Sequence, residues 1–440
     1  MPWDEQASGV AIMSNLNGAS GGNGRFAALS ADLAATRESL LKARHLPGWF
    51  YTSPEVFERE IDTIFMKEWL CVGRVEEYEK SGDYNAIRIA GEPLLIARDN
   101  QGKLGAFRNV CRHRGVEVAS GQGNTKAFKC PYHAWIYDLD GKLAGAPHSK
   151  EVEGFDLSNC SLPRVKLDTW GGYIFVNFDP GAIDLGAYLD LDGIREYAAY
   201  LKPEETRTSD KFSYVLPCNW KFVPENVMDM YHVGVIHKDS FGGHFPINDF
   251  RYVLDRHGYH ANYESFTMAP KGATLFGPMP WLEGKVTDRF ACTIWIRPSM
   301  NIFARHDLIQ PIVTTPIDVD HTLVTVYTQL PKTFFDAPAF DEKNKIYADF
   351  IRMVLSEDNA MIESLQNGVR SRAFKPGPTV KLERAIHHAL NYYLDRVYGA
   401  DETSREERVR ENRAMLREAA AARPAQDGGY SQSFLRGAAE

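Results

Sequence analysis

Two cysteine–histidine pairs lie close together in the first third of the chain. Cys111 and His113 are separated by one residue, and a second pair, Cys130 and His133, is separated by two. Thiolates and neutral imidazoles are both good ligands for transition metals. Two of each, within 23 residues, suit a mixed-ligand [2Fe-2S] centre in which the cysteines hold one iron and the histidines hold the other.

A structural zinc site is the alternative, because zinc accepts the same ligand types. Zinc motifs usually pair cysteine with cysteine and histidine with histidine, whereas each pair here mixes the two. The spacing therefore favours the iron–sulfur interpretation.

A second group of candidate ligands begins with His232 and His237, which are five residues apart. Five residues rotate a side chain by about 140° on a regular helix, so a break near Gly234 is needed if both bind one metal. A carboxylate would complete a two-histidine, one-carboxylate site with positions left open for O2 and substrate. Asp229 precedes His232 by three residues and is expected on the same helical face, where it can accept the second N–H of the imidazole.

The bulk composition limits the class of protein. A chain of 440 residues with 44% hydrophobic and 25% charged residues indicates a globular protein of two or three domains. The net charge of −8 argues against a nucleic-acid partner. We find no signal peptide and no apolar run long enough to span a membrane. Six scattered cysteines without a CxxC pair fit a reducing compartment, so we expect a cytoplasmic protein.

Changes in composition and in hydrophobic pattern divide the chain into four segments. We expect a disordered N-terminus, an amphipathic helix over 26–46 that packs with the catalytic domain, a β-rich cluster-binding domain, and a catalytic domain with a long helix over 341–366, a charged C-terminal helix and a tail. The corresponding boundaries are 1–25, 26–48, 49–179 and 180–440.

Both groups of ligands resemble motifs of the Rieske non-haem iron oxygenases. CRHRG at 111–115, CPYHAW at 130–135 and YDLDGKL at 137–143 resemble their cluster-binding segment, except that Ala134 stands where glycine is usual. NVMDMYHVGVIH at 226–237 resembles their mononuclear iron segment, with Asn226 and Tyr231 as candidates for lining the site. The third iron ligand of the family is an aspartate in a segment similar to EDNAMIESLQNG, which carries over to Asp358.

The resemblance implies an α+β fold, in which a β-rich Rieske [2Fe-2S] domain joins a helix-on-antiparallel-sheet (helix-grip-like) catalytic domain. It implies the alpha (oxygenase) subunit of an aromatic ring-hydroxylating enzyme with one [2Fe-2S] cluster and one Fe(II) per subunit. A ferredoxin or a reductase would supply the electrons, because no GxGxxG dinucleotide motif is present. The family also implies a homotrimer, with or without a small beta subunit, in which Asp229 connects His232 to His133 of the adjacent subunit.

The substrate is the least determined feature. Hydroxylation, dihydroxylation and oxidative dealkylation of an aromatic compound all remain open, with contacts expected from 285–310. Without an evident clamp for an anion, we favour a neutral aromatic compound such as an anilide herbicide. The alternative function is a Rieske-type electron carrier without oxygenase activity, which would need only the first group of ligands.

Overall fold

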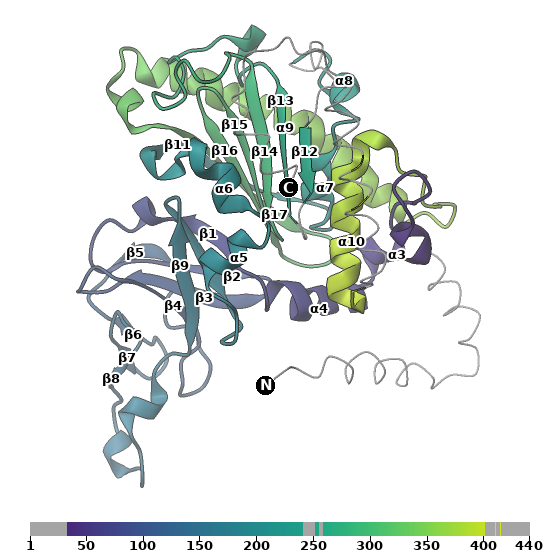
Figure 1. Cartoon of the computed structure of the whole chain (residues 1–440). Coiled ribbons are helices and arrows are strands. Elements are labelled where there is room, and N and C mark those ends of the chain that lie inside the picture. The colour runs from purple at the N-terminus through teal and green to yellow at the C-terminus, as the bar shows by residue number, and fades with distance from the viewer. Residues whose placement is uncertain (1–32, 241–250, 255–257, 401–409, 411–413, 415–440) are drawn as a thin grey trace, which may run out of the picture.

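The computed structural model describes residues 33–240, 251–254, 258–400, 410 and 414. They form a smaller, β-rich domain and a larger domain of sheet and helices (Figure 1). No helix within these residues is both long and apolar enough to cross a membrane.

The smaller domain is built on a seven-stranded antiparallel sheet with the order β1-β10-β9-β4-β3-β2-β5. A separate three-stranded sheet, β6-β7-β8, carries part of the candidate cluster site. The strands are β1 (Leu70–Arg74), β2 (Asp83–Ile89), β3 (Glu92–Arg98), β4 (Leu104–Arg108), β5 (Gly121–Asn124), β6 (Phe128–Lys129), β7 (Ile136–Tyr137), β8 (Leu143–Gly145), β9 (Arg164–Trp170) and β10 (Tyr173–Asn177).

Strand β3 explains how the smaller domain supports the candidate cluster ligands. Its run Leu94, Leu95, Ile96 and Ala97 is fully buried, and successive side chains of a strand point to opposite faces. Leu94 and Ile96 enter the main core of the chain. Leu95 and Ala97 enter a second core that includes Cys111 and the aromatic residues near it. The cluster loops are therefore packed onto the central sheet through β3.

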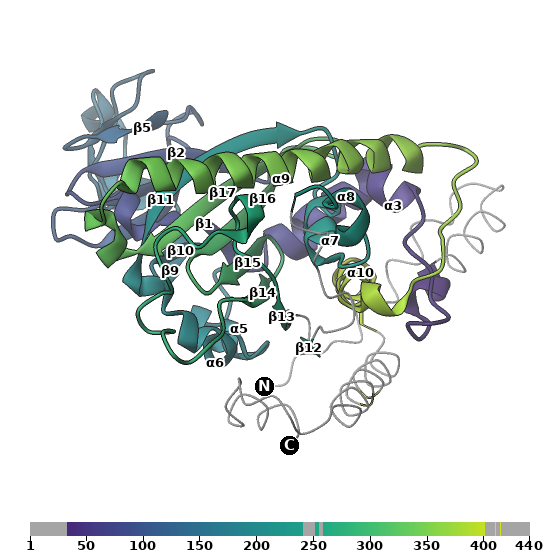
Figure 2. The same cartoon turned by 90° about the horizontal axis from the view of Figure 1, so that it is seen from above.

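The larger domain is a helix lying on a second seven-stranded antiparallel sheet, with the order β11-β17-β16-β15-β14-β13-β12. Figure 2 shows α9 crossing this sheet, as expected from the sequence. Its strands are β11 (Thr206–Leu216), β12 (Arg251–Leu254), β13 (Tyr259–Glu264), β14 (Phe290–Ile296), β15 (Met300–Arg305), β16 (Ile309–Pro316) and β17 (Thr322–Pro331). The helices are α3 (Trp49–Thr52), α4 (Pro54–Glu60), α5 (Leu185–Asp190), α6 (Ile194–Ala198), α7 (Phe222–Met228), α8 (Val233–Ile236), α9 (Phe340–Val369) and α10 (Arg384–Tyr398).

The long helix expected over 341–366 is confirmed as α9. The single helix expected over 26–46 is wrong beyond residue 37, because the chain turns there and Arg44 bridges to Pro378 instead. This backbone pairing with a distant segment outweighs the local helical periodicity. Residues 1–32 lie outside the described part, as does the expected C-terminal helix apart from residues 410 and 414. We retain 179/180 as a proposed domain boundary.

A buried ion pair ties the start of α7 to the N-terminal helices. Lys221 Nζ lies 2.6 Å from Glu60 Oε1, and neither side chain is exposed. Trp220 Nε1 donates to the other oxygen of Glu60 at 2.7 Å. Burial raises the pKa of Glu60 and lowers that of Lys221, so each charge depends on the other to remain buried. Helix α7 leads directly to the segment with the candidate ligands His232 and His237, so this pair anchors the start of that segment.

We predict that Lys221→Met lowers the free energy of unfolding by about 3–5 kcal/mol, because it leaves Glu60 buried without a cation. Urea unfolding followed by tryptophan fluorescence measures the change. The double variant Lys221→Met/Glu60→Gln removes the orphaned charge and keeps an acceptor for Trp220, so it should recover most of the loss. A double variant as unstable as the single one would show that the charge is not the cause.

Candidate metal centres

The two candidate cluster loops have the same backbone hydrogen bonds. The N–H of Cys111 donates to Val116 O, five residues on, and its carbonyl accepts from Gly115 N. The N–H of Cys130 donates to Trp135 O, again five residues on, and its carbonyl accepts from Ala134 N. The two cysteine–histidine pairs therefore lie on two turns of the same geometry.

This equivalence explains why glycine is usual at the position where Ala134 stands. Gly115 and Ala134 occupy matching positions, and both have left-handed backbone conformations, with φ of 81° and 57°. Glycine adopts this region freely, whereas a Cβ costs about 1–2 kcal/mol there. Ala134 therefore keeps the turn of the glycine-containing motif at some cost in strain.

The four candidate ligands converge with the sulfurs inside and the imidazoles outside. Cys111 and Cys130 are buried, whereas His113 and His133 are exposed, with their Nδ1 atoms 3.1 Å apart. Trp135 stacks on His113 with ring centroids 5.0 Å apart. The group fits a [2Fe-2S] centre, because two thiols and two imidazole nitrogens form opposite ends of one site.

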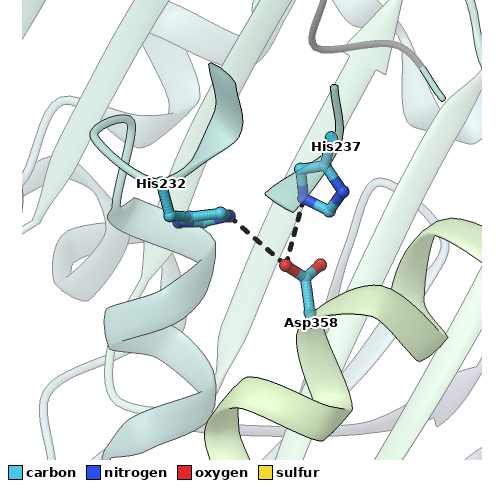
Figure 3. Close-up of side chains that lie close together, drawn as sticks. All are labelled: His232, His237 and Asp358. Atoms are coloured by element: carbon cyan, nitrogen blue, oxygen red, sulfur yellow. Dashed lines mark ion pairs between the residues drawn. The ribbon is translucent and has the colours of Figure 1, made fainter. Parts of the chain in front are cut away.

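The second candidate centre is formed by two segments that are distant in sequence. His232 and His237 flank the one-turn helix α8, and Asp358 comes from α9 (Figure 3). The break expected near Gly234 is wrong, since that residue lies within α8. The chain leaves helical geometry at His237 itself, with φ of −97° and ψ of 16°. The two imidazoles lie close together, with ring centroids 5.3 Å apart.

The geometry of these three residues suits a metal ion. Nε2 of His232 and Nε2 of His237 lie 3.3 and 3.1 Å from Oδ1 of Asp358. This buried oxygen accepts no hydrogen bond from the described residues. One ligand atom from each residue lies within 4.8 Å of the others. When Nδ1 carries the imidazole proton, the Nε2 lone pairs and the carboxylate oxygen face one another, an arrangement that needs a cation between them.

The electrostatics lead to the same conclusion. Burial alone would lower the pKa of His232, but Asp229 and Asp358 outweigh it and raise the pKa to about 9. Burial would raise the pKa of Asp358, but His232 and His237 outweigh it and lower the pKa to about 2. The site thus stabilises positive charge between its three ligands, as Fe(II) would supply.

A carboxylate stands behind each imidazole. Asp229 Oδ2 lies 3.1 Å from Nδ1 of His232, and Glu357 Oε2 lies 2.7 Å from Nδ1 of His237. The expected contact of Asp229 is present, but its expected place on a shared helical face is wrong, because Asp229 is extended at the end of α7. The sequence analysis did not find Glu357, whose only local signal is its position next to Asp358. Such partners fix the tautomer and orientation of metal-bound histidines.

The three ligands open onto one pocket with about 750 Å³ of empty space, including its mouth. Asn226 lines it, as expected, whereas Tyr231 does not, and Asp229 also lies in its wall. The expected region 285–310 contributes Phe303, Arg305 and Gln310. Much of the remaining wall is apolar and is formed by Val223, Val227, Met230, Val233, Met268, Ile312, Val324, Val354, Leu355 and Ile362.

We predict that His232→Ala, His237→Ala and Asp358→Ala each lose the mononuclear iron and keep the visible absorbance of the cluster. A site with three protein ligands loses most of its affinity when one is removed. Glu357→Gln is the control, because an outer partner should cost only about 10–100-fold in metal affinity. Iron analysis after dialysis measures both effects. If Asp358→Ala kept its iron while Glu357→Ala lost it, the ligand assignment would be wrong.

Comparison with known proteins agrees with both centres. Residues 203–399 match the family described as ring hydroxylating alpha subunit (catalytic domain), and residues 68–156 match the Rieske [2Fe-2S] domain. The chain is 31% identical over 333 residues to the carnitine monooxygenase oxygenase subunit of Acinetobacter baumannii, with 75% of this chain and 86% of that protein covered.

A second relative is the 2-aminobenzenesulfonate 2,3-dioxygenase subunit alpha of an Alcaligenes species, which is 31% identical over 309 residues, 65% of this chain and 74% of that protein. A solved quaternary ammonium Rieske monooxygenase with a bound inhibitor is similar at a TM-score of 0.70 and 26% identity, with 84% of this chain and 98% of that chain covered. The chain therefore belongs to the oxygenase alpha subunits of the Rieske non-haem iron oxygenases, enzymes with a Rieske [2Fe-2S] cluster and a mononuclear iron.

Proposed function

We propose that this protein is a terminal oxygenase that hydroxylates a small aromatic compound with O2 and with electrons from a ferredoxin or a reductase. The observation that carries the proposal is the convergence of His232, His237 and Asp358 at the wall of a largely apolar pocket. Iron bound there supplies the activation of O2, and the chain supplies the ligands and a pocket that shields the substrate from water. Asp229 and Glu357 hold the two imidazoles in the ligating tautomer.

The lining favours an aromatic substrate over a quaternary ammonium ion. Tyr263 and Phe303 are two of the rings that could surround such a cation. The guanidinium of Arg305 already lies 5.5 and 6.0 Å from their centroids. A second cation against these rings would meet a like charge, whereas an uncharged ring would not. The choice of an anilide herbicide remains a prediction from the sequence.

The proposal is tested with the purified protein, a ferredoxin–reductase pair and 18O2. We expect three irons per chain and products that carry the label. A carrier would hold two irons and form no product, and a zinc protein would be colourless. The substrates offered are a panel of small aromatic compounds. Two irons per chain with no labelled product from any of these compounds would contradict the proposal.

We further propose that the active form is a homotrimer in which the cluster of one subunit lies beside the iron site of the next. Figure 1 places β6–β8 at the side of the molecule remote from α8, so one subunit does not bring its own centres together. Exposed apolar side chains stand beside both centres and support this arrangement: Tyr132 and Ile136 near the cluster, and Tyr231 and Val235 near the iron ligands. His133 is also exposed. The proposal covers both a trimer of this subunit alone and a trimer that also contains a small beta subunit.

We predict that Asp229→Asn folds, forms trimers and retains three irons, yet turns over at a small fraction of the wild-type rate. A carboxylate can accept from His232 and from His133 of the adjacent subunit together, whereas asparagine lacks the charge and one acceptor. Stopped-flow absorbance should show slow oxidation of the reduced cluster in the presence of substrate and O2. Wild-type oxidation in this variant would rule out Asp229 as the connection.

A further inference from the structure

Arg305 lies in the wall of the substrate pocket, at the end of β15. It is the only arginine or lysine among the described residues that line this pocket. Its side chain is almost completely buried, at 3% exposed. Burying a guanidinium is costly unless a carboxylate or another anion compensates its charge.

No described carboxylate forms an ion pair with Arg305, and its hydrogen-bond partners are all neutral groups. Nε donates to Phe266 O at 3.1 Å, and Nη1 donates to Tyr263 Oη at 3.1 Å and to Ala304 O at 3.2 Å. Burial is the main cause that raises the pKa of Tyr263, so its phenol is neutral and leaves the charge uncompensated. Nη2 donates no hydrogen bond to a described residue.

The other buried cations of the described chain are paired differently. Arg297 lies 2.7 Å from Glu68 and 2.6 Å from Asp192. Arg74 lies 3.5 Å from Glu76, and Lys221 pairs with Glu60. Arg305 alone among these buried cations lacks a carboxylate, and it alone lines the substrate pocket.

The two carboxylates of the pocket do not neutralise it. Asp358 is directed at His232 and His237, and Asp229 is directed at His232. Gln310 lies on the same face of the sheet as Arg305, because it pairs with Phe303 across β15 and β16. Its side-chain amide, which also lines the pocket, forms no hydrogen bond with a described residue.

We propose that Arg305 binds an anionic group of the substrate, a carboxylate or a sulfonate, and so sets the substrate class of the pocket. The inference rests on the proposed function, since it assigns a ligand to the same pocket. The two N–H groups of Nη2 are not used by a described residue, so they can donate to an oxygen of such a group, and the amide of Gln310 adds a neutral donor on the same face of the sheet. The apolar remainder of the substrate then lies against the walls that lead to His232 and His237. The neutral compound favoured by the sequence lacks this group.

Binding to the holoenzyme tests the inference without turnover. Anaerobic titration calorimetry would compare benzoate with benzamide and 2-naphthoate with 2-naphthamide. Each pair has the same skeleton and differs in charge. We expect the carboxylate to bind about 30-fold more tightly or better, the size expected for a buried charge pair. Arg305→Gln should abolish this preference, and Arg305→Lys should restore part of it.

Arg74→Gln is the matched control, because Arg74 is equally buried at 3% and also donates to backbone carbonyls, but lies outside the pocket. It should keep the preference for carboxylates. Equal binding of acids and amides by the wild type, no binding of either acid, or an unchanged preference in Arg305→Gln would overturn the inference. If the variants do not fold, the relative affinities of the wild-type protein for acids and amides still test the inference.

L-carnitine separates this inference from the proposed aromatic substrate, because it carries a carboxylate and a quaternary ammonium group. If L-carnitine bound more tightly than both aromatic acids and lost this binding in Arg305→Gln, the aromatic proposal would fail and the role of Arg305 would stand. If labelled products formed from aromatic amides as readily as from acids, the proposed function would stand and the role of Arg305 would fail.

Discussion

Much of the structure depends on bringing three ligand atoms to one buried point. Two imidazoles and a carboxylate face one another at about hydrogen-bonding distance, and without a cation their lone pairs repel. The one-turn helix α8 sets the histidines, whereas Asp358 comes from the middle of α9. The sheet beneath α9 fixes its position, so the iron site depends on the packing of the whole larger domain.

The two imidazoles have carboxylate neighbours at both ring nitrogens, because Asp358 faces the Nε2 atoms and other carboxylates face the Nδ1 atoms. Asp229 and Glu357 each face an Nδ1 atom, so the proton is kept on the outer nitrogen and the inner lone pair faces the metal position. Asp229 directly follows α7, and α7 begins next to Lys221, which pairs with the buried Glu60. Helix α7 thus connects the buried ion pair at its start with Asp229, which contacts the candidate ligand His232.

Buried cations outside the pocket differ from the one buried cation in its wall. Outside the pocket, each buried guanidinium or ammonium group of the described residues pairs with a carboxylate, as Arg297 does with Glu68 and Asp192. In the pocket, Arg305 has only neutral partners. An uncompensated buried charge costs stability, and its retention in a binding site is understood most simply when the ligand supplies the counter-charge.

The sequence by itself determined the ligand types, the family and the general architecture. Cys111, His113, Cys130 and His133 could be proposed as cluster ligands because each pair lies within one short loop, where spacing directly limits geometry. The α9 helix was visible because its periodicity is long and uninterrupted. Only the tertiary structure placed Glu357 behind His237 and Arg305 in the pocket, since these relations depend on how α9 crosses the sheet and on which face each β15 side chain occupies. For the same reason local periodicity failed at 38–46, where pairing with the segment around Pro378 replaced the helix. Local spacing encodes what one loop can hold, whereas packing between distant segments decides which charges meet.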